Sequence, residues 1–342
     1  MSVSQIAQIS GVSKATVSRV LNGRSGVQPD NVKAVLDAAR RLQYELPRKS
    51  PRQMKKAGRS ILTVAYLRTD KELVANHSGT DLLVYEGLVA AAAERHVDLI
   101  CGSAHDLDHL PEAVEAGRVD GLILAGMSPS AQVLERLRDL PQVWVTSFRT
   151  ANDVHVLSGN EQVGAMALEY LRQRGHEQVA VVNPFSHHPA MASRSMFFEF
   201  SARQRGLDVH SYSINQPFRS GDAPEYWNQL EQTLDQLMTK LVETQPRPTG
   251  VFVPGSSGIA MAYRAAQRRG LVPGRDLDFV TCGGEVEVMS LHPRPGVVDI
   301  SPQEMGRRAV KILLGKIAEP DVRHGTIAVE PRLVAGEAFG ED

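Results

Sequence analysis

Residues 4–23 read SQIAQISGVSKATVSRVLNG and residues 26–44 read GVQPDNVKAVLDAARRLQY, and these two stretches decide how the chain begins to fold. Ser13 is a preferred N-cap residue for the helix KATVSRVLN. Pro29 starts a further helix in which apolar residues recur at intervals of three and four. A short helix that stops near Gly11 completes the set. Two short helices around a tight turn predict a helix-turn-helix, whose second helix lies in the major groove of DNA.

The charge of the chain is divided unevenly along its 342 residues. The whole chain has a net charge of −1, but residues 1–60 carry 12 Lys and Arg against 3 acids. The rest carries 26 basic and 36 acidic residues. A basic head on an acidic body indicates a polyanionic partner for the head. A solvated charged tail would explain the sign of the charge but not the ordered pattern within it.

The second helix presents side chains that suit DNA recognition. Lys14 and Arg19 can donate hydrogen bonds to guanine O6 and N7, and Ala15 can contact a thymine methyl group. Ser13, Thr16 and Ser18 suit phosphate contacts, which position a protein without specifying sequence. On an isolated helix Arg19 would be an ordinary solvated side chain. Within this motif, base reading is the favoured interpretation.

These stretches closely resemble the DNA-binding head of lactose-repressor-type (LacI/GalR) bacterial regulators, in which VSKATVSRVLNG is the signature recognition helix. The resemblance implies that Lys14, Ala15 and Arg19 read bases. It also implies backbone contacts by Asn22, and we assign Val27 to the same set. The head is expected to span residues 1–46.

The linker, residues 47–59, is strongly basic and contains no acid. Related repressors have a hinge helix here that inserts a leucine into the minor groove. This sequence departs from that pattern but offers a capping box on Ser50, with Met54 as the sizeable apolar wedge. The alternative is a flexible tether whose cations add phosphate attraction. The hinge candidates are Arg52, Met54, Lys55 and Lys56.

The body, residues 60–342, alternates short apolar runs with amphipathic helices, which predicts parallel sheets flanked by helices. The expected strands are 61–67, 97–103, 121–126, 142–147, 178–183, 250–255, 278–283 and 297–301. The expected helices are 82–95, 161–174, 192–205, 224–244, 257–269 and 302–317. Cys101 and Cys282 each lie within an apolar run and are expected to be buried free thiols.

The body also resembles the sensor of the same family, which has the two-lobed fold of periplasmic sugar-binding proteins. Matching pieces include VDGLILAG at 119–126 and PQEMGRRAVKILL at 302–314. We expect an all-α helix-turn-helix head followed by an α/β periplasmic-binding-protein-like sensor, with chain crossovers near Arg174, Glu287 and Ala318. Lobe 1 would then comprise about 60–174 and 288–318, and lobe 2 about 175–287 and 319–342.

The expected effector cleft between the lobes departs from the family. Relatives that bind sugars hold them with pairs of acid and amide side chains at three positions. At these positions this chain has Asn160-Glu161, Gly255-Ser256 and Gly283-Gly284. An arginine that clamps the effector is retained as Arg194, whereas Gly336 replaces another arginine. Thr80 and Asp81 stand where relatives carry aromatic residues. The candidates for effector binding are Asp81, Ser147, Asn160, His188, Arg194, Ser256 and Glu285.

Two alternatives concern individual side chains of this cleft. Arg194 would either clamp a ligand or pair with a helix acid, and His187 and His188 would either face the ligand or be exposed loop residues. The lost carboxylates indicate either a changed ligand, such as a larger or more acidic saccharide, or no ligand at all.

The sequence therefore predicts a DNA-binding transcriptional regulator, most simply a repressor. We expect it to bind a pseudo-palindromic operator as a homodimer and to respond to a sugar-related small molecule. No cofactor and no metal site are expected. An enzyme is disfavoured because the common catalytic motifs are missing, and His176-Glu177 lacks the second histidine of a zinc motif. A transported-solute binding protein is disfavoured by the head. With no secretory signal and no apolar run near 18 residues, we expect a cytoplasmic protein without a membrane span.

Overall fold

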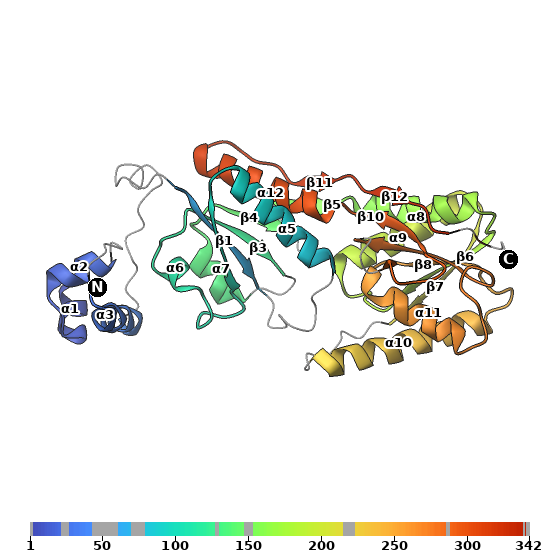
Figure 1. The fold of residues 1–342 in the computed structure, drawn as a ribbon, viewed down its shortest axis with the longest axis horizontal. Coiled ribbons are helices and arrows are strands. Elements are labelled where there is room, and N and C mark those ends of the chain that lie inside the picture. Colours follow the sequence, from blue (N-terminus) through green and yellow to red (C-terminus); the bar gives the residue numbers. More distant parts are fainter. Residues whose placement is uncertain are drawn as a thin grey trace.

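The computed structural model describes residues 3–21, 27–42, 61–69, 79–126, 130–146, 153–214, 223–284, 288–337 and 339. Figure 1 shows three bodies in chain order, a small helical head and two α/β lobes. The helix-turn-helix head and the two-lobed sensor of parallel sheets flanked by helices are therefore confirmed. None of the helices in these ranges is both long and apolar enough to cross a bilayer.

The head consists of α1 (Val3–Ser10), α2 (Lys14–Leu21) and α3 (Pro29–Arg41). Each helix buries one apolar stripe against the other two. Their shared core contains Ile6, Val17, Val20, Val35, Ala38 and Ala39. Gly11, with φ of 70°, makes the turn between α1 and α2, a backbone conformation that favours glycine.

Lobe 1 is built on a six-stranded parallel sheet in the order β11-β5-β4-β3-β1-β2. The strands are β1 (Thr63–Arg68), β2 (Asp98–Ser103), β3 (Gly121–Ala125), β4 (Gln142–Val145), β5 (His155–Ser158) and β11 (Ile327–Val329). Helices α5 (Gly79–Glu94) and α12 (Pro302–Ala318) pack on one face. The opposite face is covered by α6 (Glu112–Glu115) and α7 (Ala131–Leu137).

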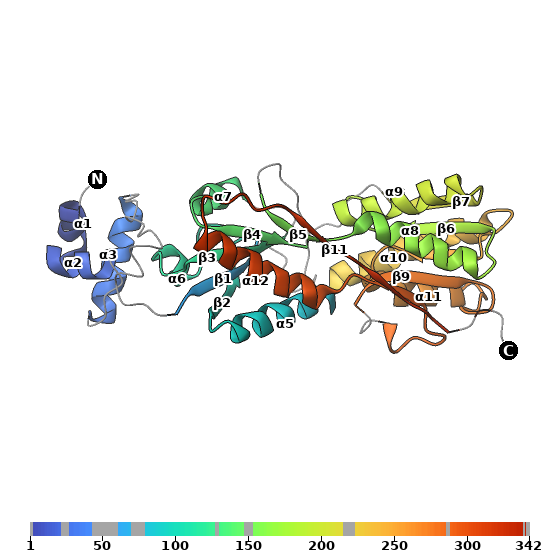
Figure 2. The same cartoon turned by 90° about the horizontal axis from the view of Figure 1, so that it is seen from above.

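Lobe 2 repeats this architecture in the order β12-β10-β9-β8-β6-β7 (Figure 2). The strands are β6 (Gln178–Asn183), β7 (Asp208–Ser213), β8 (Gly250–Val253), β9 (Asp278–Gly283), β10 (Gly296–Asp299) and the antiparallel β12 (Arg332–Val334). Helices α8 (Asn160–Gln173) and α9 (Pro189–Gln204) cover one face. The short η1 (Ser256–Gly258) leads into α11 (Ile259–Gln267), which covers the other face with α10 (Ala223–Glu243).

The predicted lobe boundaries are wrong. The chain crosses between lobes after Ser158, Asp299 and Val329, where β5, β10 and β11 end, and not near Arg174, Glu287 and Ala318. The prediction kept each helix with the strand before it. In the structure α8 packs on lobe 2, β10 pairs with β9 in lobe 2, and β11 pairs with β5 in lobe 1.

One of the two cysteines also differs from the prediction. Cys282 is buried in β9, but Cys101 is exposed. Cys101 lies on β2, which is the edge strand of its sheet and contains only exposed and half-buried residues. An apolar run therefore does not guarantee burial when its strand has a neighbour on one side only.

Candidate functional site

The start of α2 is fixed by a side-chain cap. The backbone N–H of Thr16 donates to Ser13 Oγ at 3.1 Å, which satisfies one of the free amides of the first turn. The hydroxyl groups of the same two residues lie 2.9 Å apart. Ser13 thus caps the recognition helix, as the sequence predicts.

The two sides of α2 have opposite characters. Val17 and Val20 are buried in the head core. The opposite side is exposed and carries Lys14, Ala15, Ser18 and Arg19. This face joins two cations, Lys14 at the start of the helix and Arg19 in its last turn, with a small apolar side chain and a hydroxyl, a combination suited to a DNA groove.

The remaining head and linker candidates divide into two groups. Val27 is half-buried and packs against the head core, so its side chain is committed to packing. Asn22 and the hinge candidates Arg52, Met54, Lys55 and Lys56 lie outside the described residues.

Arg194 joins the two lobes at the first crossover and is only 6% exposed. Its Nε donates to Asn160 Oδ1 at 2.8 Å, and its Nη2 donates to Ser158 Oγ at 3.1 Å. Its Nη1 donates to the carbonyl oxygen of Pro254 at 3.0 Å and to Cys282 Sγ at 3.1 Å. Ser158 Oγ in turn donates to Asn160 Oδ1 at 2.8 Å.

These contacts exclude one of the two interpretations of Arg194 and leave its role as a ligand clamp a prediction. Four of the five N–H groups of a guanidinium have acceptors within the protein here. Within the described ranges, none of the ion pairs of the structure involves Arg194, so the alternative of a pairing with a helix acid is wrong. Arg194 instead links the end of β5 in lobe 1 to the ends of β8 and β9 in lobe 2.

His188 lies beside this cluster at the N-terminus of α9. Its Nδ1 accepts a hydrogen bond from the backbone N–H of Ala190 at 3.2 Å, so the neutral ring caps the helix. Burial, and then the positive charge of Arg194, lowers the pKa of His188 to about 4. His187 is exposed and His188 half-buried, so the expectation of an exposed loop residue holds for His187 alone.

Asp81 lies on the lobe 1 side, in the first turn of α5. Its Oδ1 is 2.9 Å from Nη1 of Arg68, the last residue of β1, and both side chains are mostly buried. This ion pair lies at the carboxyl edge of the lobe 1 sheet, the edge at which ligands bind in open parallel sheets.

Two glycines bring the lobes into close contact near Ser256. A Cβ atom on Gly283 would lie 2.2 Å from Ser256 Oγ and 3.4 Å from Thr80 Oγ1. A Cβ atom on Gly284 would lie 2.5 Å from Leu83 Cδ1 in α5. An acidic pair at these two positions would not fit this arrangement.

The structure therefore brings together Asn160, His188 and Arg194 and places Asp81 and Ser256 at the facing sheet edges. Ser147 and Glu285 lie outside the described residues. Sequence reasoning missed Ser158, Cys282 and Arg68. Each is the last or next-to-last residue of a strand, and that position could have indicated that these residues lie at the site.

Comparison with known proteins agrees with this architecture. The family profile described as "Bacterial regulatory proteins, lacI family" matches residues 2–46, and the "Periplasmic binding protein-like domain" profile matches residues 168–339. Catabolite control protein A of Priestia megaterium is 26% identical over 329 residues, covering 92% of this chain and 91% of that protein. The ribose operon repressor of Escherichia coli K12 is 23% identical over 340 residues, covering 96% and 97%.

Solved structures share the fold over the whole chain. A transcriptional regulator CelR–cellobiose complex aligns with a TM-score of 0.64 at 18% identity, covering 99% of both chains. A lac repressor dimer bound to operator and the anti-inducer ONPF aligns with a TM-score of 0.62 at 18% identity, covering 98% of both. By their names, the ribose relative and both of these structures are transcriptional regulators or repressors. The chain belongs to the lacI family of bacterial regulatory proteins, with a periplasmic binding protein-like domain as its body.

Proposed function

We propose that the chain is a repressor that reads a pseudo-palindromic operator with α2. The exposed face of α2, with Lys14, Ala15 and Arg19 opposite a buried Val17 and Val20, carries this proposal. One such helix reads only a short half-site, so useful specificity requires a two-fold dimer. As a regulator it works on the chromosome, which places it in the cytoplasm at the nucleoid.

The roles of the contacts follow from their chemistry. Lys14, Ala15 and Arg19 read base edges, while Ser13, Thr16 and Ser18 hold phosphates together with the capped helix start. Val27 would contact the DNA backbone through its own main chain, because its side chain is packed. Asn22 and the linker residues Arg52, Met54, Lys55 and Lys56 complete the proposed contact set.

The effector would bind between the facing edges of the two sheets, with Asp81, Ser147, Asn160, His188, Arg194, Ser256 and Glu285 as its contacts. Relatives are named for ribose and sucrose operons, and one fold relative is a cellobiose complex, so a sugar or sugar derivative is the first class to test. Two observations favour the alternative of a sensor without ligand. Arg194 is engaged within the protein, and Gly283 and Gly284 lie directly against α5.

Operator selection with the full chain tests the proposal. After selection from genomic fragments, the preferred site and random DNA are titrated with wild type, Arg19→Ala and Lys33→Ala. Arg19→Ala should weaken binding to the preferred site by about 1–3 kcal/mol and lower its preference over random DNA. Lys33 is exposed on α3, so its removal is a matched loss of one charge that should leave the preference unchanged. If wild type and Arg19→Ala prefer the selected site over random DNA to the same degree, Arg19 does not read bases.

A further inference from the structure

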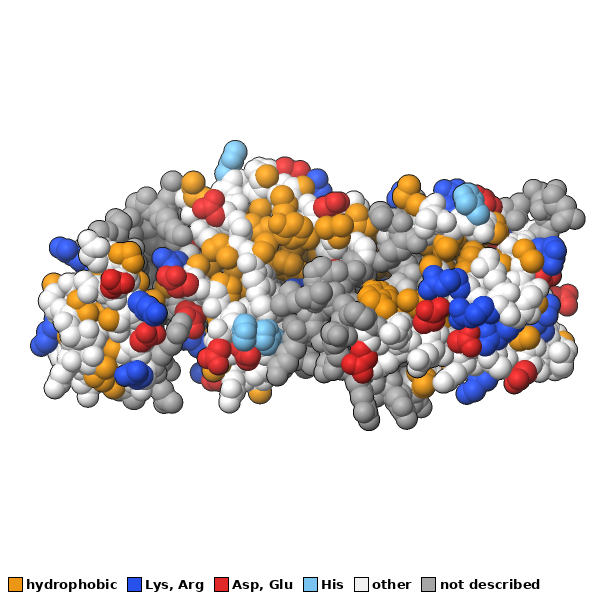
Figure 3. Space-filling model, turned by 60° about the horizontal axis from the view of Figure 1, so that its bottom comes forward, with side chains coloured by type: hydrophobic (Ala, Val, Ile, Leu, Met, Phe, Trp, Pro, Cys, Tyr) orange, Lys and Arg blue, Asp and Glu red, His pale blue; other side chains and the backbone are white. Residues whose placement is uncertain are grey.

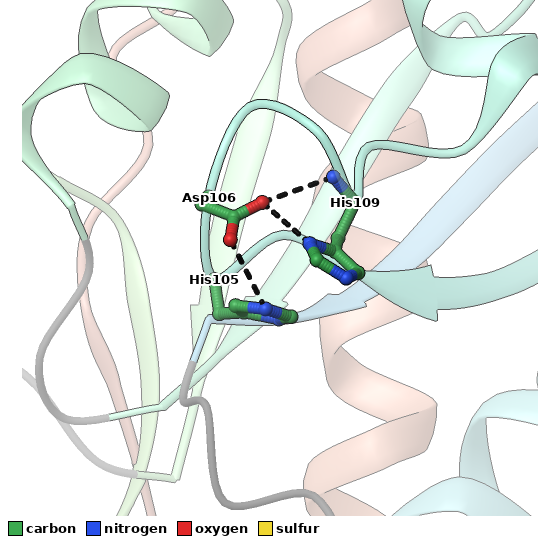
Figure 4. Close-up of side chains that lie close together, drawn as sticks. All are labelled: His105, Asp106 and His109. Atoms are coloured by element: carbon green, nitrogen blue, oxygen red, sulfur yellow. Dashed lines mark hydrogen bonds and ion pairs between the residues drawn. The ribbon is translucent and has the colours of Figure 1, made fainter.

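The loop between β2 and α6 contains a cluster that the regulator function does not use. Residues 105–109 read HDLDH, and His105, Asp106 and His109 turn toward one another (Figure 4). Each of the three offers one ligand atom, and these atoms all lie within 4.8 Å of one another. Two imidazoles and a carboxylate are a donor set typical of transition-metal sites.

One distance within the cluster is close to the one that an ion imposes. His105 Nε2 lies 3.3 Å from Asp106 Oδ2. Ligand bonds of about 2.0–2.2 Å in tetrahedral geometry place neighbouring donor atoms about 3.4 Å apart. His109 Nδ1 lies 2.6 Å from Asp106 Oδ1, a hydrogen bond whose proton an ion would displace. Small side-chain movements are therefore enough to admit the ion.

A hydrogen bond with Ser103 already orients His105. Its Nδ1 lies 2.6 Å from Ser103 Oγ at the end of β2. If Nδ1–H donates to this hydroxyl, the lone pair of Nε2 points into the cluster, which is the arrangement that metal-binding histidines generally have.

We propose that His105, Asp106 and His109 form a binding site for a divalent transition-metal ion of the zinc class. The nitrogen donors favour such an ion over calcium or magnesium, which prefer oxygen ligands. Three protein ligands leave a tetrahedral ion one position for water or for the donor atom of a small molecule.

The site lies near the edge at which the effector would bind. Ser103 is in register with Arg68, and the N–H of Ala104 donates to the carbonyl oxygen of Arg68 at 2.7 Å. Arg68 in turn pairs with Asp81 on α5. The metal ligands therefore begin two residues beyond the point where β1 and β2 separate, at the carboxyl edge of the lobe 1 sheet. The proposal does not depend on DNA binding or on an organic effector.

Zinc titration of the full chain, freed of metal with a chelator, tests the site. Zn²⁺ is added in competition with a chromophoric chelator, and Co²⁺ serves as a visible probe of the ligand geometry. Wild type should take up one ion per chain. His109→Gln should weaken binding at least ~10-fold, and Ser103→Ala should weaken it ~10–100-fold without changing the stoichiometry.

The matched control is His292→Gln, which also removes one imidazole, since the side chain of His292 is 84% exposed and lies on lobe 2. It should bind zinc as wild type does. The His109 side chain is itself 58% exposed, so its replacement should leave the far-UV circular dichroism unchanged. Wild-type affinity in His109→Gln, or no saturable zinc uptake by wild type, would overturn the proposal.

Discussion

At the residue scale, Arg194 and His188 combine a structural role with a proposed ligand role. The sequence predicted that both lie near the effector site, because the resemblance placed them there. It did not predict the partners of Arg194, since Asn160, Ser158 and Pro254 come from segments 34 to 60 residues away. Those contacts depend on where the chain crosses between lobes, which local patterns do not encode.

Because His188 caps α9 in its neutral form, the stability of the protein should depend on pH. The unfolded chain protonates His188 near its ordinary pKa of about 6.5, whereas the folded chain does so only at about 4. Between these values the unfolded state binds more protons, so stability falls as the pH falls. We expect His188→Gln to lose less stability than wild type between pH 7 and 4, measured by urea unfolding.

The control for this prediction is His292→Gln, whose wild-type side chain is almost fully exposed. It should follow the wild-type pH dependence. If His188→Gln and wild type lose stability in parallel, His188 does not stay neutral in the folded protein.

At the element scale, most helices and eight of the strands were predictable because their apolar runs are long or periodic. The strands β5, β7, β11 and β12 were missed. The sequence of β7, DVHSYS, is mostly polar, and β5, β11 and β12 span only 4, 3 and 3 residues, so these strands gain their structure by pairing with a neighbour rather than from their own pattern. The helices α6 and α7 were missed because they span only 4 and 7 residues.

The packing of α5 against α12 was equally invisible in the sequence and depends on two glycines. A Cβ atom on Gly306 would lie 2.2 Å from the carbonyl oxygen of Val84, and one on Gly87 would lie 2.0 Å from that of Gln303. Gly306→Ala should therefore force the helices apart and lower the free energy of unfolding by about 1–3 kcal/mol in denaturant titrations.

Gly315→Ala, in the same helix, is the matched control for Gly306→Ala. Its Cβ atom would meet only the side chain of His324, at 3.2 Å. The gain in helix propensity should make this variant neutral or more stable by about 0.5–1 kcal/mol. Equal effects of the two substitutions would show that close packing does not limit α12.

At the scale of the whole molecule, the two-lobed plan was predictable and the crossovers were not. Alternating strands and helices predict parallel sheets, but they do not show which sheet a helix covers. The separation of β5 from α8 arises from packing between segments far apart in sequence. The same packing leaves apolar side chains exposed on α5: Leu82 at 59%, Tyr85 at 39% and Val89 at 41%.

We expect these side chains to form part of the dimer surface that the proposed function requires. Figure 3 shows hydrophobic side chains gathered on the surface at the position that α5 occupies along the long axis of Figure 1. Leu82→Glu would place a carboxylate in an apolar contact, which costs enough to weaken dimerisation at least ~10-fold. Sedimentation should show the monomer at concentrations where wild type is dimeric.

Operator binding should weaken in parallel, because a monomer reads only one half-site. Met196→Glu is the control, since Met196 is 57% exposed on α9 of lobe 2 and the chemical change is the same. It should leave both dimerisation and operator affinity unchanged. If the Leu82→Glu chain remains dimeric, the dimer interface does not include this face of α5. A monomeric chain that still binds the full operator with wild-type affinity would instead remove the need for a dimer in operator recognition.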